Sequence, residues 1–285
     1  MKIGVIAGFD GRRPPEFIAG VAKIAEERGL HSFYVPEHVL FFREYASRYP
    51  YAEDGRIPGE PDGTLEPFTA LSFIAAHTSQ IRLGTGICLV PQRNPVYTAK
   101  QAADVDFLSG GRLDLGVGVG WLREEFQALQ VPWEQRGART AEYIRVMQAL
   151  WCEEVSEYKG ELYTLPACVQ NPKPTQKPHP PIFFGGESDA ALRRVAELGQ
   201  GWYGFQVAAE QLGERLARLD ALLAEAGRSR NDLRIHISPP GRLRGPEELA
   251  PFREAGVDQL LFPFFARDLD GYARRADSLA ELARA

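Results

Sequence analysis

The chain has 285 residues, of which 44% are hydrophobic and 25% are charged, and its formal net charge is −5. This size and balance fit one large α/β domain with a substantial buried core. Lysines and arginines are scattered along the chain and no apolar run is long enough to span a bilayer, so we expect a cytoplasmic enzyme that binds neither nucleic acid nor membranes.

The first part of the chain alternates between apolar runs and amphipathic segments. Residues 3–8 and 32–37 read as buried strands, and residues 15–29 and 67–79 read as helices. Between the second strand and the second helix lies a long polar and aromatic excursion over residues 39–65. Insertions of this length usually carry function.

The middle of the chain continues the alternation. Strands are predicted over residues 81–90 and 113–119, and helices over residues 95–108 and 139–151. Residues 153–180 are rich in Pro, Lys and Tyr, which predicts a loop with a short hairpin near residues 158–165. We expect this segment to cover one end of the fold.

Four further strand-helix pairs follow. The strands are predicted at 182–184, 201–205, 233–237 and 259–263, and the helices at 189–198, 208–226, 246–255 and 269–283. Eight strands with continuous apolar runs, each followed by a helix, predict a (β/α)₈ TIM barrel with insertion loops at its C-terminal face. No linker-like stretch interrupts residues 1–285, so a single domain is expected.

In such a barrel the active site lies where the strands end. The predicted strand ends carry several glycines and only one histidine, His38, with no nucleophile elbow and no lysine. Cys88, Cys152 and Cys168 are odd in number and lack CxxC spacing, which argues against disulfides and a metal site. Because the predicted strand ends hold so few groups that could catalyse a reaction themselves, we expect a bound cofactor to carry out the chemistry.

Several segments in order along the chain resemble one known family. They are Glu37-His38, the run from Leu83 to Ile87, the run from Ser109 to Trp121, and Gly185-Gly186-Glu187-Ser188. The chain resembles the bacterial luciferase-like superfamily, most closely its branch of oxidoreductases that use the deazaflavin coenzyme F420. The resemblance extends over almost the whole chain.

The resemblance implies roles for particular residues. His38 would stand beside the reactive ring and handle a proton, although a histidine that merely caps a strand is the plainer alternative. Glu37 would orient His38 or face solvent. Gly86-Ile87 matches a place where relatives have a cis peptide against the ring, and the open alternative is an ordinary strand.

Three further groups are expected at the cofactor. Gly118 and Gly120 would let the cofactor's ribityl chain approach the backbone, and Trp121 stands where the sugar-phosphate dehydrogenase branch has a glutamate, so that branch's substrate is not expected here. Gly185, Gly186 and Ser188 would hold a phosphate at a helix start, unless they form a simple turn. Gln92 and Arg93 are candidates for the edge or tail of the cofactor.

The predicted function is F420-dependent hydride transfer to or from a small organic substrate. The alternative is an FMNH2-dependent luciferase-like monooxygenase, and the lower alternative is a flavin-binding protein without turnover. A flavin or F420 reductase is a possible partner. Loop aromatics would wall a substrate pocket or simply anchor their loops; they are Phe41, Phe42, Tyr45, Tyr49, Tyr51, Tyr158 and Tyr163. A homodimer is expected, with Phe68, Leu71, Phe73 and Ile74 as candidates for its interface.

Overall fold

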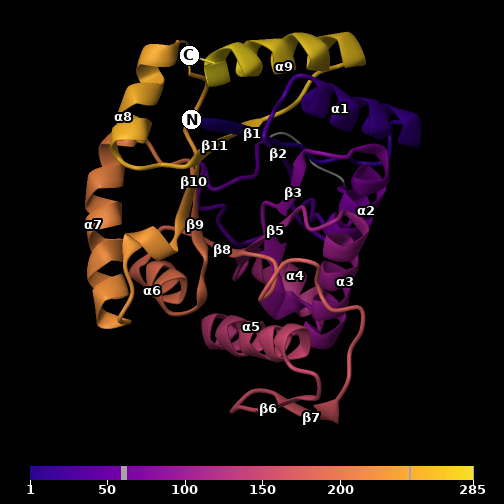
Figure 1. The fold of residues 1–285 in the computed structure, drawn as a ribbon, viewed down its shortest axis with the longest axis vertical. Coiled ribbons are helices and arrows are strands. Elements are labelled where there is room, and N and C mark those ends of the chain that lie inside the picture. Colours follow the sequence, from indigo (N-terminus) through magenta and orange to yellow (C-terminus); the bar gives the residue numbers. More distant parts are fainter. Residues whose placement is uncertain (59–62, 244, 285) are drawn as a thin grey trace.

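Parallel strands alternate with helices along the chain and close into a ring in the computed structural model, which describes residues 1–58, 63–243 and 245–284 (Figure 1). The eight positions of the ring are taken by β1 (Lys2–Ile6), β2 (Ser32–Val35), β3 (Arg82–Thr85), β5 (Leu113–Gly118), β8 (Ile182–Gly185), β9 (Gly201–Phe205), β10 (Arg234–Ser238) and β11 (Gln259–Pro263). Each pairs in parallel with its neighbours, and pairing of β3 with β5 completes the circle. The predicted (β/α)₈ barrel is confirmed.

The third barrel strand differs from the prediction of one strand over residues 81–90. It is divided into β3 and the two-residue β4 (Cys88–Leu89), with a cis peptide between Gly86 and Ile87 at the break. β3 pairs with both β2 and β5, whereas the register of β4 is with β5. A 3₁₀ turn over Val90–Gln92 follows at once.

The helices surround the barrel (Figure 1). They are α1 (Pro15–Glu27), α2 (Pro67–His77), α3 (Pro95–Leu108), α4 (Arg123–Ala128), α5 (Arg136–Cys152), α6 (Asp189–Leu198), α7 (Ala209–Glu225), α8 (Ala250–Glu254) and α9 (Leu269–Arg284). Short 3₁₀ turns at Arg230–Asp232 and Pro246–Leu249 precede β10 and α8. The short α4 was not predicted, and α5 begins three residues earlier than expected.

Local sequence explains where several helices begin. Pro15, Pro67 and Pro95 are first residues of helices, a position where the missing N–H costs nothing. The Asn94 side chain accepts a hydrogen bond from the N–H of Val96 at 2.9 Å and so caps α3.

The core has two layers. Inside the ring lie Ile6, Tyr34, Phe183, Tyr203 and Leu261, and the larger layer fills the space between strands and helices. Because the barrel strands are covered on both faces, most of their residues are apolar and buried, and the polar exceptions such as Asp114 and His236 are buried as well. Helix α2 turns Phe68, Leu71 and Ile74 into this outer layer, where each is at most 2% exposed. The expectation that these three residues supply a dimer interface is therefore wrong.

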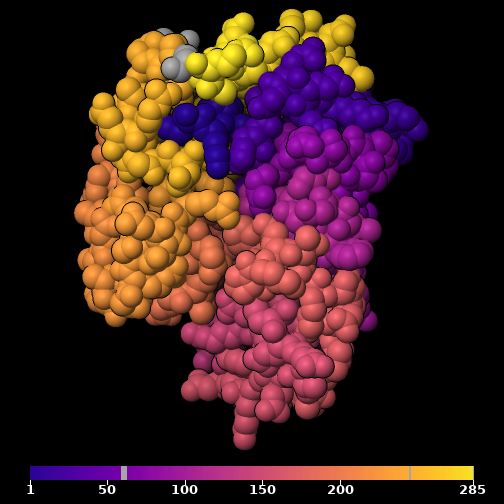
Figure 2. Space-filling view, in the orientation of Figure 1, coloured from indigo at the N-terminus to yellow at the C-terminus, as the bar shows by residue number. Residues whose placement is uncertain are grey.

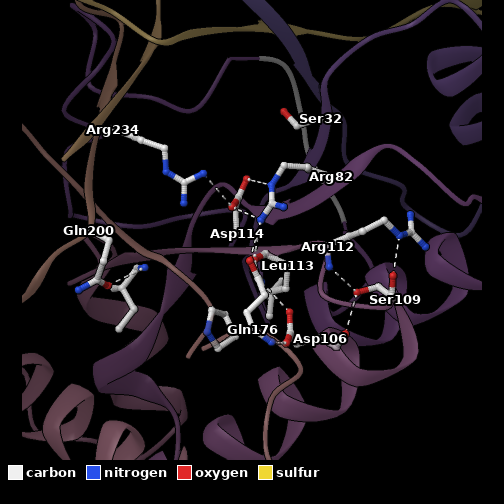
Figure 3. Close-up of polar contacts among 12 residues, drawn as sticks. Ser32, Arg82, Asp106, Ser109, Arg112, Leu113, Asp114, Gln176, Gln200 and Arg234 are labelled. Carbon is white, nitrogen blue, oxygen red and sulfur yellow. Dashed lines mark hydrogen bonds and ion pairs between the residues drawn. The ribbon is translucent and has the colours of Figure 1, made fainter. Parts of the chain in front are cut away.

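A polar cluster lies where the strands begin (Figure 3). Arg82 reaches across to Asp114, with Nη2 2.6 Å from Oδ1, and Asp114 is buried. Gln176 donates to the carbonyl of Leu113 at 2.7 Å and to Asp106 Oδ1 at 2.7 Å. This network fills the N-terminal end of the barrel, so the opposite end is left for a ligand.

The segment after α5 forms the predicted hairpin, with β6 (Ser156–Lys159) antiparallel to β7 (Thr164–Cys168). It lies beyond α5, at the lower end of the molecule in Figures 1 and 2. Tyr163 packs on Tyr143 of α5 with ring centroids 5.5 Å apart. The prediction that Tyr158 and Tyr163 wall a substrate pocket is not borne out, because the hairpin packs against the outside of the helix layer.

Candidate active site

A cavity of about 840 Å³ opens at the C-terminal ends of the strands. It takes backbone and side chains from the ends of β1, β5, β8, β9 and β11, from the turn between β3 and β4, and from the excursion after β2. Its size suits a flat cofactor together with a small substrate. Of the predicted site residues it is lined by His38, Gly86, Ile87, Gly118, Gly120, Trp121, Gly185 and Gly186.

His38 follows β2 and is held from one side. Its Nδ1 lies 3.2 Å from Oε2 of Glu125 in α4, and 16% of its side chain is exposed. Since Nδ1 is engaged by a carboxylate, Nε2 is the ring nitrogen left to meet a ligand in the cavity. This arrangement fixes the ring's orientation and leaves one nitrogen for proton exchange.

Glu125 is fully buried and accepts several hydrogen bonds. The N–H of Val39 donates to Oε1 at 2.7 Å, and Gln92 Nε2 donates to Oε2 at 3.0 Å. Burial alone would raise the pKa of Glu125, but its bonds to His38, Gln92 and the backbone hold that pKa below the ordinary value. Glu125 is therefore a carboxylate at neutral pH.

Glu37 takes neither of the roles expected for it. It is 4% exposed, accepts the N–H of Leu89 at 2.5 Å and pairs with Arg93. Burial raises the pKa of Glu37, and the charge of Arg93 opposes that rise. Arg93 also donates to Glu66 at 2.8 Å. Because Glu37 accepts a hydrogen bond from β4 and Glu66 caps α2, Arg93 links these two elements through their carboxylates. Neither Arg93 nor Gln92 lines the cavity, because both serve buried carboxylates.

The cis peptide implied by the resemblance is present between Gly86 and Ile87. The Ile87 side chain then projects between two of the predicted glycines. A Cβ on Gly118 would lie 2.0 Å from Ile87 Cδ1, and one on Gly185 would lie 2.8 Å from it. Any larger residue at either position would clash with Ile87. The sequence alone did not reveal this reason for the two glycines.

Aromatic rings form the wall beside His38. The ring of Trp121 lies 5.9 Å from that of His38 and 5.2 Å from that of Tyr49. Phe41 lies 5.1 Å from His38, and Tyr51 packs edge-on to Phe205 at 4.8 Å. Phe41, Tyr49 and Tyr51 all line the cavity, so for these three the prediction of a pocket wall is confirmed.

The residues of the predicted phosphate-binding turn have two different roles: Gly186 lines the cavity, and Ser188 caps a helix. Gly186 lines the cavity with φ of +106°, a conformation that other residues rarely adopt. Ser188 is exposed and caps α6, its Oγ accepting the N–H of Ala191 at 3.3 Å. Glu187 accepts hydrogen bonds from Tyr51 Oη at 3.2 Å and from the N–H of Phe205 at 2.9 Å, so its carboxylate is engaged away from the turn.

The sequence model for luciferase-like monooxygenases matches residues 1–249. The chain belongs to this family. A protein of Mycobacterium tuberculosis, described only as uncharacterised, is 32% identical over 266 residues, which are 92% of this chain and 92% of the relative. The FMNH2-dependent dimethylsulfone monooxygenase of Pseudomonas putida is 32% identical over 81% of this chain and 59% of that longer protein.

Solved structures share the luciferase-like barrel. A monooxygenase from Streptomyces bottropensis superposes with a TM-score of 0.80 at 22% identity, covering 99% of this chain and 98% of the other. The coenzyme F420-dependent tetrahydromethanopterin reductase of Methanopyrus kandleri gives 0.74 at 15% identity, with 97% and 98% covered. At such identities the likeness establishes the fold alone.

The cavity fits a flavin-type ring. Ile87 and Trp121 present apolar surface, and the bare backbone of Gly118, Gly185 and Gly186 adds an edge without side chains. Family members use flavin or F420, and the residues in this cavity are compatible with either. An oxidoreductase activity is therefore supported for the chain. No helix in the described ranges is both long and apolar enough to cross a bilayer.

Proposed function

We propose that the protein is an F420-dependent oxidoreductase that transfers hydride to or from a small organic substrate. The observation that carries this proposal is His38 at the cavity, with its Nδ1 bound to the buried carboxylate of Glu125. A proton carrier held in one orientation suits a reaction in which a carbonyl or alcohol oxygen gains or loses a proton. The F420-dependent reductase that shares the fold supports the choice of cofactor.

The bound cofactor would supply the hydride chemistry, and this chain's residues would do the rest. Gly118, Gly185, Gly186 and Trp121 would bind its ring and chain, and the aromatic loop would exclude water. His38 Nε2 would hold the proton at the substrate oxygen, while Glu125 stabilises the charged imidazole. Tyr49, Tyr51 and Tyr203 also line the cavity, but burial raises the pKa of each, so these phenols stay protonated at neutral pH.

A second candidate is an FMNH2-dependent monooxygenase. The specific observation in its favour is the 32% identity to the Pseudomonas putida enzyme, whose name states that cofactor. The same dyad would then serve an oxygen-using reaction, and a flavin reductase would be the partner. The two candidates share the cavity and differ in the cofactor that binds with useful affinity.

Fluorescence-quenching titrations of the purified protein with F420 and with FMN decide between them. Preference for F420, together with reduction of a ketone or oxidation of an alcohol, supports the first proposal. Preference for FMN and oxygen consumption with reduced FMN supports the second. A protein that binds neither would refute both.

We further propose a cytoplasmic homodimer of single-domain subunits. Helix α3 carries exposed apolar side chains at Tyr97, Phe107 and Leu108, which are 73%, 57% and 65% exposed. Large exposed apolar groups on one helix are typical of interfaces. Light scattering on a sizing column should give twice the chain mass of 31.7 kDa; a single chain mass would contradict it.

A further inference from the structure

The cavity extends beyond the strands expected to hold the cofactor. The residues proposed to bind the ring come from the ends of β5 and β8 and from the turn between β3 and β4, whereas part of the lining comes from the β1–α1 and β11–α9 loops. β1 and β11 pair with each other and lie across the ring from β5 and β8. His38 follows β2, the other neighbour of β1, so it lies between the two parts of the cavity. The part over β1 and β11 is therefore left for the substrate.

The wall over β1 and β11 is rich in aromatic rings. It is lined by Phe9, Phe17, Phe265 and Tyr272. The rings of Phe17 and Tyr272 meet edge to face with centroids 5.8 Å apart, and Phe265 is 64% exposed at the mouth. An exposed phenyl ring on a cavity wall loses contact with water when an apolar molecule binds against it, which favours binding. This wall predicts a substrate with an apolar body.

One cation, Arg13 of the β1–α1 loop, interrupts this apolar wall. Its Nη2 donates to the carbonyl oxygen of Arg267 in the β11–α9 loop at 2.7 Å, and its Cζ lies 5.1 Å from the centroid of the Phe17 ring. These contacts hold the guanidinium where the two loops meet. Among the residues that the structure describes, Arg13 forms no ion pair with a carboxylate and no other side-chain hydrogen bond. The remaining N–H donors of the guanidinium are thus available to a ligand.

The carboxylates of these two loops have other partners. Asp10 Oδ1 accepts the N–H of Arg12 at 3.0 Å, and Asp10 Oδ2 lies 3.4 Å from Arg12 Nε. Asp268 Oδ1 accepts the N–H of Gly271 at 2.8 Å, at the start of α9. Arg12 therefore has a carboxylate beside it, whereas the charge of Arg13 is left for an anion that enters from outside.

We propose that the substrate is an apolar oxo acid or hydroxy acid whose carboxylate binds Arg13, an inference that rests on the proposed function and names its substrate class. The planar guanidinium presents paired donors that match the two oxygens of a carboxylate. The apolar body then lies against Phe17 and Phe265, and the carbonyl or alcohol carbon at its other end lies beside His38. Arg13 is thereby the residue that selects an acid over a neutral molecule of the same shape.

The test compares ligands that share a shape and differ in charge. Para-acetylbenzoate and levulinate are titrated calorimetrically, beside their methyl esters, into protein loaded with oxidised F420, with which a ketone cannot react. The unaltered protein should bind each acid about five- to tenfold more tightly than its ester, the gain expected for a charge-assisted contact at an exposed rim. Arg13→Gln should abolish this preference by weakening the acids alone. Arg13→Lys, which keeps the charge but loses the planar fork, should retain part of it.

Arg267→Gln is the matched control. It removes the same charge from the adjoining loop, where the Arg267 side chain is exposed and is not among the described residues that line the cavity, and it keeps the carbonyl oxygen that Arg13 contacts. This variant should bind acids and esters as the unaltered protein does. Steady-state rates with reduced F420 should show the same division. Arg13→Gln should raise KM for the acids and leave kcat nearly unchanged, because Arg13 binds the end of the substrate remote from the reaction.

Two results would overturn the inference alone: no preference for acid over ester in the unaltered protein, or equal loss of that preference in Arg13→Gln and Arg267→Gln. Either would leave the proposed function standing as long as F420 binds and neutral ketones are reduced. Failure to bind F420 would refute the proposed function, and the same titrations on the protein without cofactor would still decide the role of Arg13. Unfolding midpoints establish that each variant is folded.

Discussion

At the scale of single residues, the decisive contact joins His38 to Glu125, two residues 87 positions apart. His38 could be proposed from the sequence because it is the one histidine at a predicted strand end. Glu125 could not, because it lies in an unpredicted six-residue helix whose position depends on the whole barrel. Glu37, adjacent to the histidine in sequence, takes a different role because its side chain points into the wall beside β4.

Replacing His38 by Ala should leave cofactor affinity within about threefold and slow the single-turnover rate on the order of 100-fold, since only the proton carrier is lost. Stopped-flow measurement of the reduced cofactor reports the rate, and the titration reports binding. An unchanged rate would remove His38 from the catalytic role.

Glu125→Gln tests a positioning role. The variant keeps the shape but loses the carboxylate, so we expect turnover to fall about tenfold. In a His38→Ala background the same change should have almost no further effect on turnover, because the two residues act as one unit. Independent, additive losses in the double variant would show that Glu125 acts apart from His38.

At the scale of elements, α4 also holds the excursion that covers the cavity. Glu124 Oε1 accepts the N–H of Ala46 at 2.7 Å, and Glu124 Oε2 accepts Ser47 Oγ at 2.7 Å. Burial would raise the pKa of Glu124, but these bonds lower it below the ordinary value. The ionised Glu124 on α4 therefore holds in place the loop that carries the aromatic wall.

Glu124→Ala should loosen this loop without unfolding the barrel. Loss of bonds worth about 1 kcal/mol should increase amide exchange at Ala46 and Ser47 roughly fivefold. Hydrogen exchange with mass spectrometry measures this, and Glu134→Ala provides a control acid whose partner Arg123 is exposed. Equal exchange in both variants would contradict the loop's dependence on Glu124.

The elements themselves were largely predictable, because strands buried on both faces are mostly apolar and helices start at prolines and capping residues. The break in the third strand was not, since its cause is tertiary: Ile87 packs into space left by Gly118 and Gly185. The location of the 153–180 segment also depends on packing against α5, which local sequence does not encode.

At the scale of the whole molecule, the barrel interior carries a histidine that must stay neutral. His236 is 2% exposed, stacks on Phe183 with centroids 4.1 Å apart, and lies 3.2 Å from Tyr34 Oη. Burial lowers the pKa of His236 to about 3. In the unfolded chain the pKa of this histidine is near 6.5. Between about pH 3 and pH 6.5 the unfolded chain therefore binds a proton at His236 that the folded barrel does not.

Stability should consequently be full above about pH 6.5 and should fall as pH drops toward 3, by up to about 1.4 kcal/mol per unit from this residue. Urea unfolding at pH 7 and pH 5 measures the loss. His236→Gln should reduce the difference between the two pH values by roughly 2 kcal/mol, and His31, whose pKa burial lowers to about 4, accounts for part of the pH dependence that remains. An identical pH dependence in the variant would refute this account.

Two adjacent side chains of α4 make different contacts. Glu124 binds Ser47 in the excursion after β2, and Glu125 orients the ring of His38. If residues 46 and 47 moved away to admit a molecule, the bonds to Glu124 would transmit that displacement to α4, and with it to the carboxylate that orients His38. Entry to the cavity and alignment of the imidazole would then depend on the same six residues.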